Sequence, residues 1–254
     1  MIDLTPFTTD AYLVATIQSK QDTLKIFENA DYRWLTLGDE LTLQGVMEKS
    51  QPQQVCNPVN QAMLLFLLCS EPSSQILNLG LGSGCFERAV TNKAGFELTT
   101  VEINPNVIKA AKQYFFLNDN NHIVAQCAEQ FVAQSSRKFD VILIDVFSGK
   151  SQPAFLQKQA FLCDCHARLS TYGKICINVT AKNKQQLIAL LTTLRSLFSH
   201  IVVIEFNQYK NIVLIASEQR LDAINIEQIK QHKDFSSPDL AAEIKQLFYI
   251  PKLD

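Results

Sequence analysis

The spacing of apolar and polar residues predicts alternating strands and helices from about residue 75 to residue 200. Short apolar runs alternate with longer segments of helical pattern, and the run FDVILID is apolar on both faces. Strands of that kind need helices on both sides, which favours an open, mostly parallel α/β sheet. The predicted strands are residues 76–79, 98–103, 122–125, 139–145 and 174–179, and the predicted helices are 85–94, 107–115, 128–134, 153–169 and 184–198.

The two ends of the chain have different patterns. Near the N-terminus, residues 32–37 and 41–44 alternate in polarity around the turn-forming residues 38–40, which predicts a β-hairpin. A loop at 49–58 and a buried helix at 60–69 follow. We therefore expect a small β region over residues 1–58 and a nucleoside-binding catalytic domain over 59–254. Residues 201–206 and 211–217 form a second hairpin, and the tail, 221–254, has an amphipathic helical pattern.

Composition excludes several classes of protein. Of the 254 residues, 47% are apolar and 19% charged, and the net charge is −2, which argues against disorder and against a basic nucleic-acid-binding surface. The longest apolar run, residues 62–69, is too short to cross a membrane, and the first residues lack a secretory signal. Seven scattered cysteines fit reduced thiols better than disulfides, so we expect a cytoplasmic enzyme.

A glycine-rich loop, residues 80–84 (GLGSG), follows the first predicted strand. Glycines at this position permit a tight turn and close approach of a ligand to the backbone, although a packing turn would have the same composition. Glu102 ends the second strand 18 residues after Gly84, where a carboxylate can accept both hydroxyl hydrogens of a ribose. A dinucleotide fingerprint would need Gly or Ala at Cys85, so the spacing favours an S-adenosylmethionine-type nucleoside instead.

Four stretches together resemble the spermidine synthase superfamily, in particular its spermidine-synthase-like methyltransferase-fold members. They are residues 43–47 (LQGVM), 76–84 (ILNLGLGSG), 101–107 (VEINPNV) and 139–149 (FDVILIDVFSG). The resemblance implies a class I methyltransferase-like, Rossmann-like α/β fold. It would contain a mostly parallel seven-stranded sheet with an antiparallel edge hairpin, preceded by a small N-terminal β region. It also implies a homodimer.

The same resemblance implies the ligand and its contacts. The nucleoside would be S-adenosylmethionine, decarboxylated S-adenosylmethionine or the methylthioadenosine product, with no metal. Glu102 would hold the ribose and Asp145 would be the catalytic carboxylate. The remaining residues implied to bind the cofactor are Gln44, Gly80, Gly82, Ser83, Gly84, Ile103, Cys127, Ala128 and Phe147.

Several positions depart from the polyamine-forming members of the superfamily. Ser83 replaces an aspartate that recognises the amine of the decarboxylated donor, and Ser148 replaces a second acid near the acceptor. The acceptor-side tyrosine, histidine and glutamate of the family align with residues 59–61 (VNQ), and Cys127 replaces an adenine-side aspartate. A buried diamine needs paired carboxylates, yet residues 49–70 and 146–163 contain no acid.

These departures leave three functions open. We favour methyl transfer to a small-molecule acceptor, with Asp145 taking the proton of an amine or holding its charge. An aminopropyltransferase with an unusual acceptor and a non-catalytic nucleoside-binding protein are the alternatives. A metal site is not expected, because the four histidines show no ligand spacing and Cys163 and Cys165 point apart on a helix. Nucleic-acid and membrane partners are likewise not expected.

Overall fold

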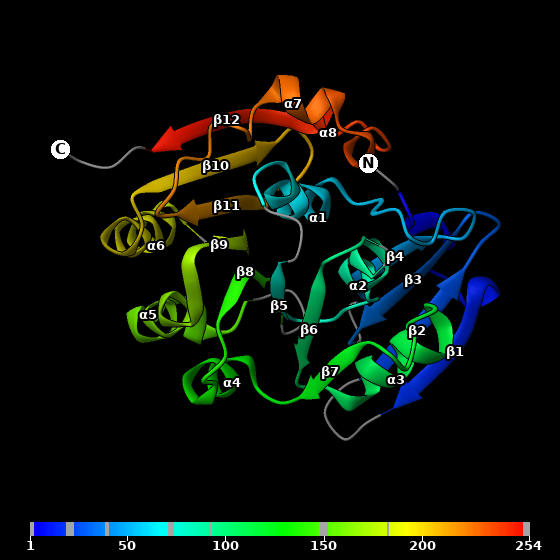
Figure 1. Cartoon of the computed structure of the whole chain (residues 1–254). Coiled ribbons are helices and arrows are strands. Elements are labelled where there is room, and N and C mark those ends of the chain that lie inside the picture. The colour runs from blue at the N-terminus through cyan, green and yellow to red at the C-terminus, as the bar shows by residue number, and fades with distance from the viewer. Residues whose placement is uncertain are drawn as a thin grey trace.

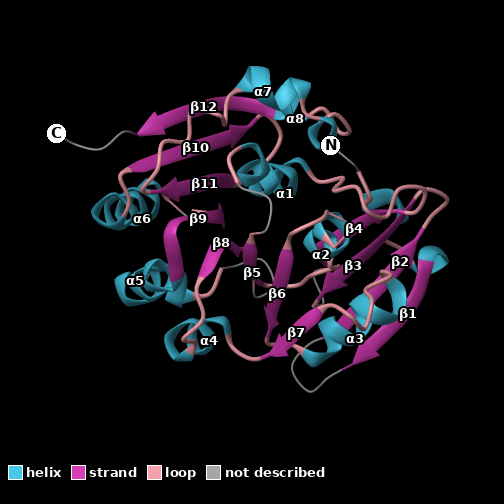
Figure 2. Ribbon diagram, in the orientation of Figure 1, coloured by secondary structure: helices cyan, strands magenta, loops and turns pink. Residues whose placement is uncertain are grey.

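The computed structural model describes residues 3–18, 23–38, 41–70, 74–91, 93–147, 152–181 and 183–250. Two β-sheets with helices packed around them make up the fold (Figures 1 and 2). The predicted hairpin turn includes Asp39 and Glu40, and the motif after the fourth strand includes Ser148 and Gly149. These four residues lie outside the described ranges.

The larger sheet has eight strands in the order β12-β10-β11-β9-β8-β5-β6-β7. Strands β9, β8, β5, β6 and β7 are parallel to one another. At the edge beyond β9, each successive strand, β11, then β10, then β12, is antiparallel to the strand before it. The mostly parallel α/β sheet and its antiparallel edge hairpin are therefore confirmed, whereas the predicted number of seven strands is wrong because β12 adds an eighth. Its strands are β5 (Gln75–Leu79), β6 (Glu97–Glu102), β7 (His122–Ala125), β8 (Phe139–Ile144), β9 (Leu169–Val179), β10 (His200–Phe206), β11 (Ile212–Ser217) and β12 (Ile244–Ile250).

Helices cover both faces of this sheet, as strands apolar on both sides require. In β8, Val141 and Leu143 face one apolar cluster, and Ile142 and Ile144 face the other. Helices α4, α5 and α6 pack on one side, and α1, α2, α7 and α8 on the other (Figure 1). The helices are α1 (Pro58–Met63), α2 (Cys85–Val90), α3 (Pro105–Tyr114), α4 (Ala128–Gln134), α5 (Gln159–Arg168), α6 (Lys184–Leu197), α7 (Ile226–Gln231) and α8 (Leu240–Glu243).

The N-terminal β region is a complete antiparallel sheet rather than a single hairpin. It contains β1 (Leu13–Gln18), β2 (Thr23–Glu28), β3 (Tyr32–Leu37) and β4 (Thr42–Glu48) in sequence order. One face packs on α3, and the other encloses Trp34, which is fully buried and stacks on Phe27 at a centroid distance of 5.8 Å. Trp34 is therefore a core residue.

The tail of the chain differs from its predicted helical pattern. Its described part, residues 221–250, contains the short helices α7 and α8 and a 3-10 turn over Lys233–Phe235. Residues 244–250 become β12, which pairs antiparallel with β10. The segment LFYI within β12 is rich in aromatic and branched residues that suit a strand. Residues 244–250 form a strand and not a helix because they can pair with the open edge of β10. The local sequence pattern carries no information about that edge.

Two other helices are shorter than expected. The predicted helix at 60–69 is α1 followed by a tight 3-10 turn over Leu64–Leu68, and the predicted helix at 153–169 is interrupted before Gln159. Among the helices that the structure describes, none is both long enough and apolar enough to span a membrane.

Candidate active site

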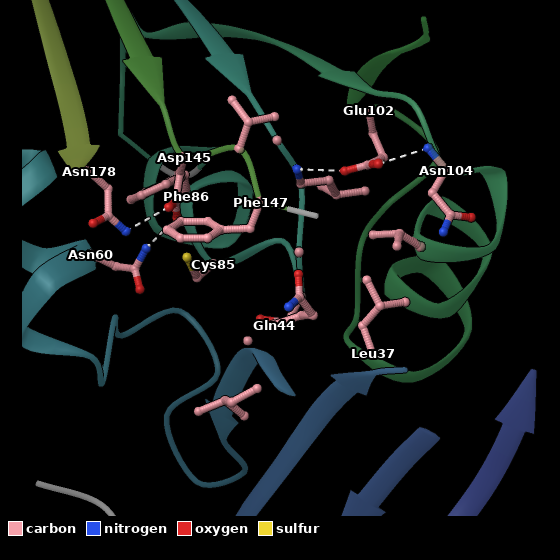
Figure 3. Close-up of a pocket in the computed structure, with 18 of the residues that line it drawn as sticks. Leu37, Gln44, Asn60, Cys85, Phe86, Glu102, Asn104, Asp145, Phe147 and Asn178 are labelled. Carbon is pink, nitrogen blue, oxygen red and sulfur yellow. Dashed lines mark hydrogen bonds between the residues drawn. The ribbon is translucent and has the colours of Figure 1, made fainter. Parts of the chain in front are cut away.

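A cleft of about 890 Å³ lies where the carboxyl ends of β5, β6 and β8 meet β4 of the N-terminal sheet. This is where open α/β sheets bind ligands. Every residue predicted to bind the cofactor lines this cleft except Gly84, which caps the start of α2. The carboxylates of Glu102 and Asp145 mark its two ends (Figure 3). We call these the ribose end and the acceptor end.

The glycine loop is shaped by its contacts with neighbouring backbone. Gly80 and Gly82 have φ angles of +98° and +54°, which L side chains rarely adopt. A Cβ on Gly82 would lie 2.6 Å from the Gln44 backbone oxygen, and one on Gly80 would collide with the Asp145 backbone oxygen. These two glycines are therefore required for the turn and for close packing of the protein itself. This requirement holds whether or not they also contact a ligand.

Gly80→Ala is expected to lower the free energy of unfolding by roughly 2–4 kcal/mol, which combines a positive-φ penalty with the collision. Gly38→Ala is the matched control, because Gly38 has a φ of +74° and a Cβ added to it would have no atom within 4 Å. The control should lose only about 1–2 kcal/mol. Urea denaturation of both variants measures the difference, and equal losses would show that the close approach to Asp145 does not matter.

Arg88 of α2 holds the glycine loop in place through hydrogen bonds to backbone oxygens. Its guanidinium donates hydrogen bonds to the backbone oxygens of Ser83, Phe115 and Pro52, the last two at 3.0 and 2.6 Å. The Ser83 hydroxyl is fully buried against Gly45 of β4 and has no hydrogen-bond partner within the described part of the chain. Ser83 thus lines the cleft, while its hydroxyl is covered by the N-terminal sheet.

Glu102 connects the glycine loop with the start of α3. One carboxylate oxygen accepts from the Leu81 backbone N–H at 3.0 Å, and the other accepts from the Asn104 N–H at 2.8 Å (Figure 3). Burial raises the pKa of Glu102, and the backbone hydrogen bonds oppose that shift. Each oxygen retains further acceptor capacity, so the pair can still receive two hydroxyl hydrogens.

Asp145 is held at the acceptor end by two amides. Asn178 donates to one carboxylate oxygen and Asn60 to the other, both at 2.8 Å, and the two side chains approach from different elements (Figure 3). Burial raises the pKa of Asp145, and the two amide hydrogen bonds lower it. The carboxylate is therefore held in one orientation and partly buried in the cleft, where it can accept a proton from a bound group.

The other predicted residues are spread along the cleft. Phe147 lies between the ribose end and the acceptor end in Figure 3, and Gln44 enters from β4. Cys127 precedes α4, and the adjacent Ala128 is buried. Ile103 is 66% exposed at the rim, so it is free to pack on a bound ring.

Four residues of the acceptor end were not predicted from the sequence. Asn178 and Thr180 lie at and just after the carboxyl end of β9, and Tyr209 and Asn211 belong to the connection between β10 and β11. The rule that sites form at the carboxyl ends of strands would have indicated the first two. The position of the hairpin connection over the cleft depends on tertiary packing.

Within the described ranges, no three His, Cys, Asp or Glu side chains are grouped so as to hold a metal ion. All seven cysteines are free thiols. Cys85 lies in the cleft (Figure 3), where burial raises the pKa of its thiol and so keeps it protonated.

The chain matches known proteins over much of its length. The family model described as "Methyltransferase small domain" matches residues 59–213. The chain belongs to the methyltransferase small domain family. This family member is a transferase with the S-adenosylmethionine-dependent methyltransferase fold that spermidine synthases share, and that fold implies an S-adenosylmethionine-related ligand.

The relatives of this methyltransferase small domain protein include both aminopropyltransferases and methyltransferases. The polyamine aminopropyltransferase of Chromobacterium violaceum is 26% identical over 215 residues, covering 83% of this chain and 82% of the relative. A crystal structure described as a probable spermidine synthase from Corynebacterium glutamicum has a TM-score of 0.76 and 16% identity, covering 94% and 90% of the two chains. Human methyltransferase-like protein 13, solved with SAH, has a TM-score of 0.60 and 18% identity, covering 75% and 95%.

Proposed function

We propose that the protein transfers the methyl group of S-adenosylmethionine to the nitrogen of a small amine. The observation that supports this most strongly is the acceptor end of the cleft. The described lining residues include two carboxylates, and Asp145 is at this end whereas Glu102 is at the ribose end. A diamine substrate would bring two ammonium charges, which need paired carboxylates when buried. One oriented carboxylate can balance the charge of one amine.

The residues of the cleft would position the donor and acceptor and accept one proton. Glu102 would receive the two ribose hydroxyls, and Phe147 would help to exclude water between the two ends. The amine lone pair attacks the methyl carbon, the carbon–sulfur bond breaks, and its electron pair stays on the sulfur of the departing thioether. Asp145 would take the proton that the amine nitrogen loses, with Asn60 and Asn178 as positioning residues.

The environment of Ser83 supports the intact donor over its decarboxylated form. In polyamine-forming relatives an aspartate at this position recognises the amine of the decarboxylated donor. Here the side chain is a neutral hydroxyl, buried against Gly45. The loop therefore offers no carboxylate that would select decarboxylated S-adenosylmethionine.

The proposal is tested with purified protein, either donor and a panel of amines, with products identified by mass spectrometry. Methylated amine formed from S-adenosylmethionine is the expected product, with kcat/KM at least tenfold above that for the decarboxylated donor. An amine lengthened by an aminopropyl group, formed faster than any methylated product, would contradict methyl transfer and favour the polyamine reaction.

Asn60→Leu is expected to shift the pH dependence of the reaction. Transfer needs the deprotonated carboxylate, so activity falls as the pH drops through the pKa of Asp145, which burial already raises. Loss of the Asn60 amide removes a donor that lowers this pKa, so the acid limb of the kcat/KM profile should move to higher pH. An unmoved limb, with activity retained, would show that Asp145 is not the group that titrates.

A further inference from the structure

We infer that the acceptor is a monoamine whose remaining part is uncharged, and that the neutral wall formed by Asn178, Thr180, Tyr209 and Asn211 selects it. This inference rests on the proposed methyl transfer and specifies its substrate class. The wall lies beside Asp145 at the acceptor end, and its members come from β9 and from the β10–β11 connection.

The charge at the acceptor end is that of one carboxylate. The undescribed residues 148–151 (SGKS), which follow Asp145 closely in the chain, contain no acid, and the next acid in the sequence is Asp164. Glu243 is near enough to Tyr209 to raise its pKa, but it does not line the cleft. Among the described lining residues there is also no lysine, arginine or histidine that would balance an anionic substrate.

A chain of hydrogen bonds fixes the neutral wall in place. Asn178 donates to Asp145, and its own oxygen accepts from the amide of Asn211 at 2.9 Å. The same amide of Asn211 donates to the Thr180 hydroxyl at 3.2 Å. Gln152 then bridges the backbone of Asn178 and Thr180, at 2.6 and 2.9 Å. A fixed wall of neutral groups selects a substrate more sharply than mobile side chains do.

Three polar atoms of the acceptor end remain available to a substrate. The side-chain oxygens of Asn60 and Asn211 and the hydroxyl of Tyr209 have no hydrogen-bond partner in the part of the chain that is described. Burial raises the pKa of Tyr209 to about 12, so its hydroxyl stays neutral at physiological pH. Together these atoms can accept from an amine and exchange hydrogen bonds with a hydroxyl or carboxamide.

A second ammonium group would meet only neutral partners at this wall. A buried charge without a counter-ion is costly, and hydrogen bonds to amides compensate for it only partly. A carboxylate tail would find no cation among the described lining residues and would lie near Asp145. We therefore expect both charged tails to be disfavoured by at least tenfold in kcat/KM against a neutral tail of the same length.

A matched set of four-carbon primary amines, ending in a hydroxyl, a second amine or a carboxylate, tests the inference with S-adenosylmethionine as donor. The amino alcohol should be methylated with at least tenfold higher kcat/KM than the diamine or the amino acid. Thr180→Asp should then raise the ratio of diamine to amino-alcohol turnover at least tenfold. The new carboxylate can still accept from Asn211, and together with Asp145 it would supply the two carboxylates that a diamine needs. Thr180→Asn introduces an uncharged side chain of the same size as aspartate, and it should leave that ratio unchanged.

The possible failures are distinguishable. Equal turnover of diamine and amino alcohol by the unmodified protein would overturn the inference without any variant. Tight donor binding with methyl transfer to an anionic acceptor only would also overturn it, while the nucleoside site would stand. Absence of donor binding would instead remove the proposed function on which the inference depends.

Discussion

Replacing Asp145 with asparagine is expected to lower the rate of methyl transfer by about 10²–10⁴-fold, the range typical of losing a general base. The substitution keeps the size of the side chain but removes its charge and its capacity to take a proton. Donor affinity should change little, because Glu102, which would hold the ribose, lies at the other end of the cleft. Single-turnover kinetics together with calorimetric titration of the donor separate these two effects.

Asp140→Asn is the matched control for this variant. Asp140 lies near the start of β8, whereas Asp145 directly follows the end of that strand. The Asp140 carboxylate also accepts two hydrogen bonds, from the Gln75 N–H at 2.8 Å and the Ser170 hydroxyl at 2.6 Å. It should retain transfer activity. Unchanged turnover in Asp145→Asn would exclude a proton-accepting role for Asp145 and would favour a non-catalytic nucleoside-binding protein.

Glu102→Gln is expected to weaken binding of S-adenosylmethionine and S-adenosylhomocysteine by at least about 100-fold. Two hydrogen bonds to a charged carboxylate contribute about 1.5–3 kcal/mol each, and the amide can reproduce neither at full strength. Its NH2 group also faces a backbone N–H of Leu81 or Asn104, each of which now donates to the carboxylate. Isothermal titration calorimetry measures the loss of affinity.

Glu97→Gln tests whether the effect belongs to the site or to the strand. Glu97 begins β6, the strand that Glu102 ends, and its exposed side chain accepts from the Gln75 amide at 2.8 Å. Affinity for both ligands should be unchanged in this variant. Similar weakening in both variants would mean that the strand, and not a ribose contact of Glu102, accounts for the loss.

The elements that carry the donor site were predictable because they obey local rules. The run FDVILID has no polar face, so it had to become a central strand, and Asn104 and Pro105 supply the cap and first residue of α3. Glu102 and Asp145 were predictable as site residues because both stand at carboxyl ends of parallel strands, which share one edge of a sheet.

The features that escaped prediction depend on contacts between distant segments. The strand β12 forms because β10 has an open edge. In the N-terminal sheet, β2 pairs with β3 and β1 pairs with β2. Asn60 and Asn178 are 118 positions apart in the sequence, yet both reach Asp145. In the sequence Asn60 indicates only the absence of a family histidine, whereas in the structure its side-chain amide donates to the Asp145 carboxylate.

A crystal structure with S-adenosylhomocysteine bound tests the central claim most directly. The account predicts that the ribose hydroxyls lie within hydrogen-bond distance of the Glu102 carboxylate, with the sulfur directed toward Asp145. A ligand bound elsewhere, or a ribose that Glu102 does not contact, would contradict it.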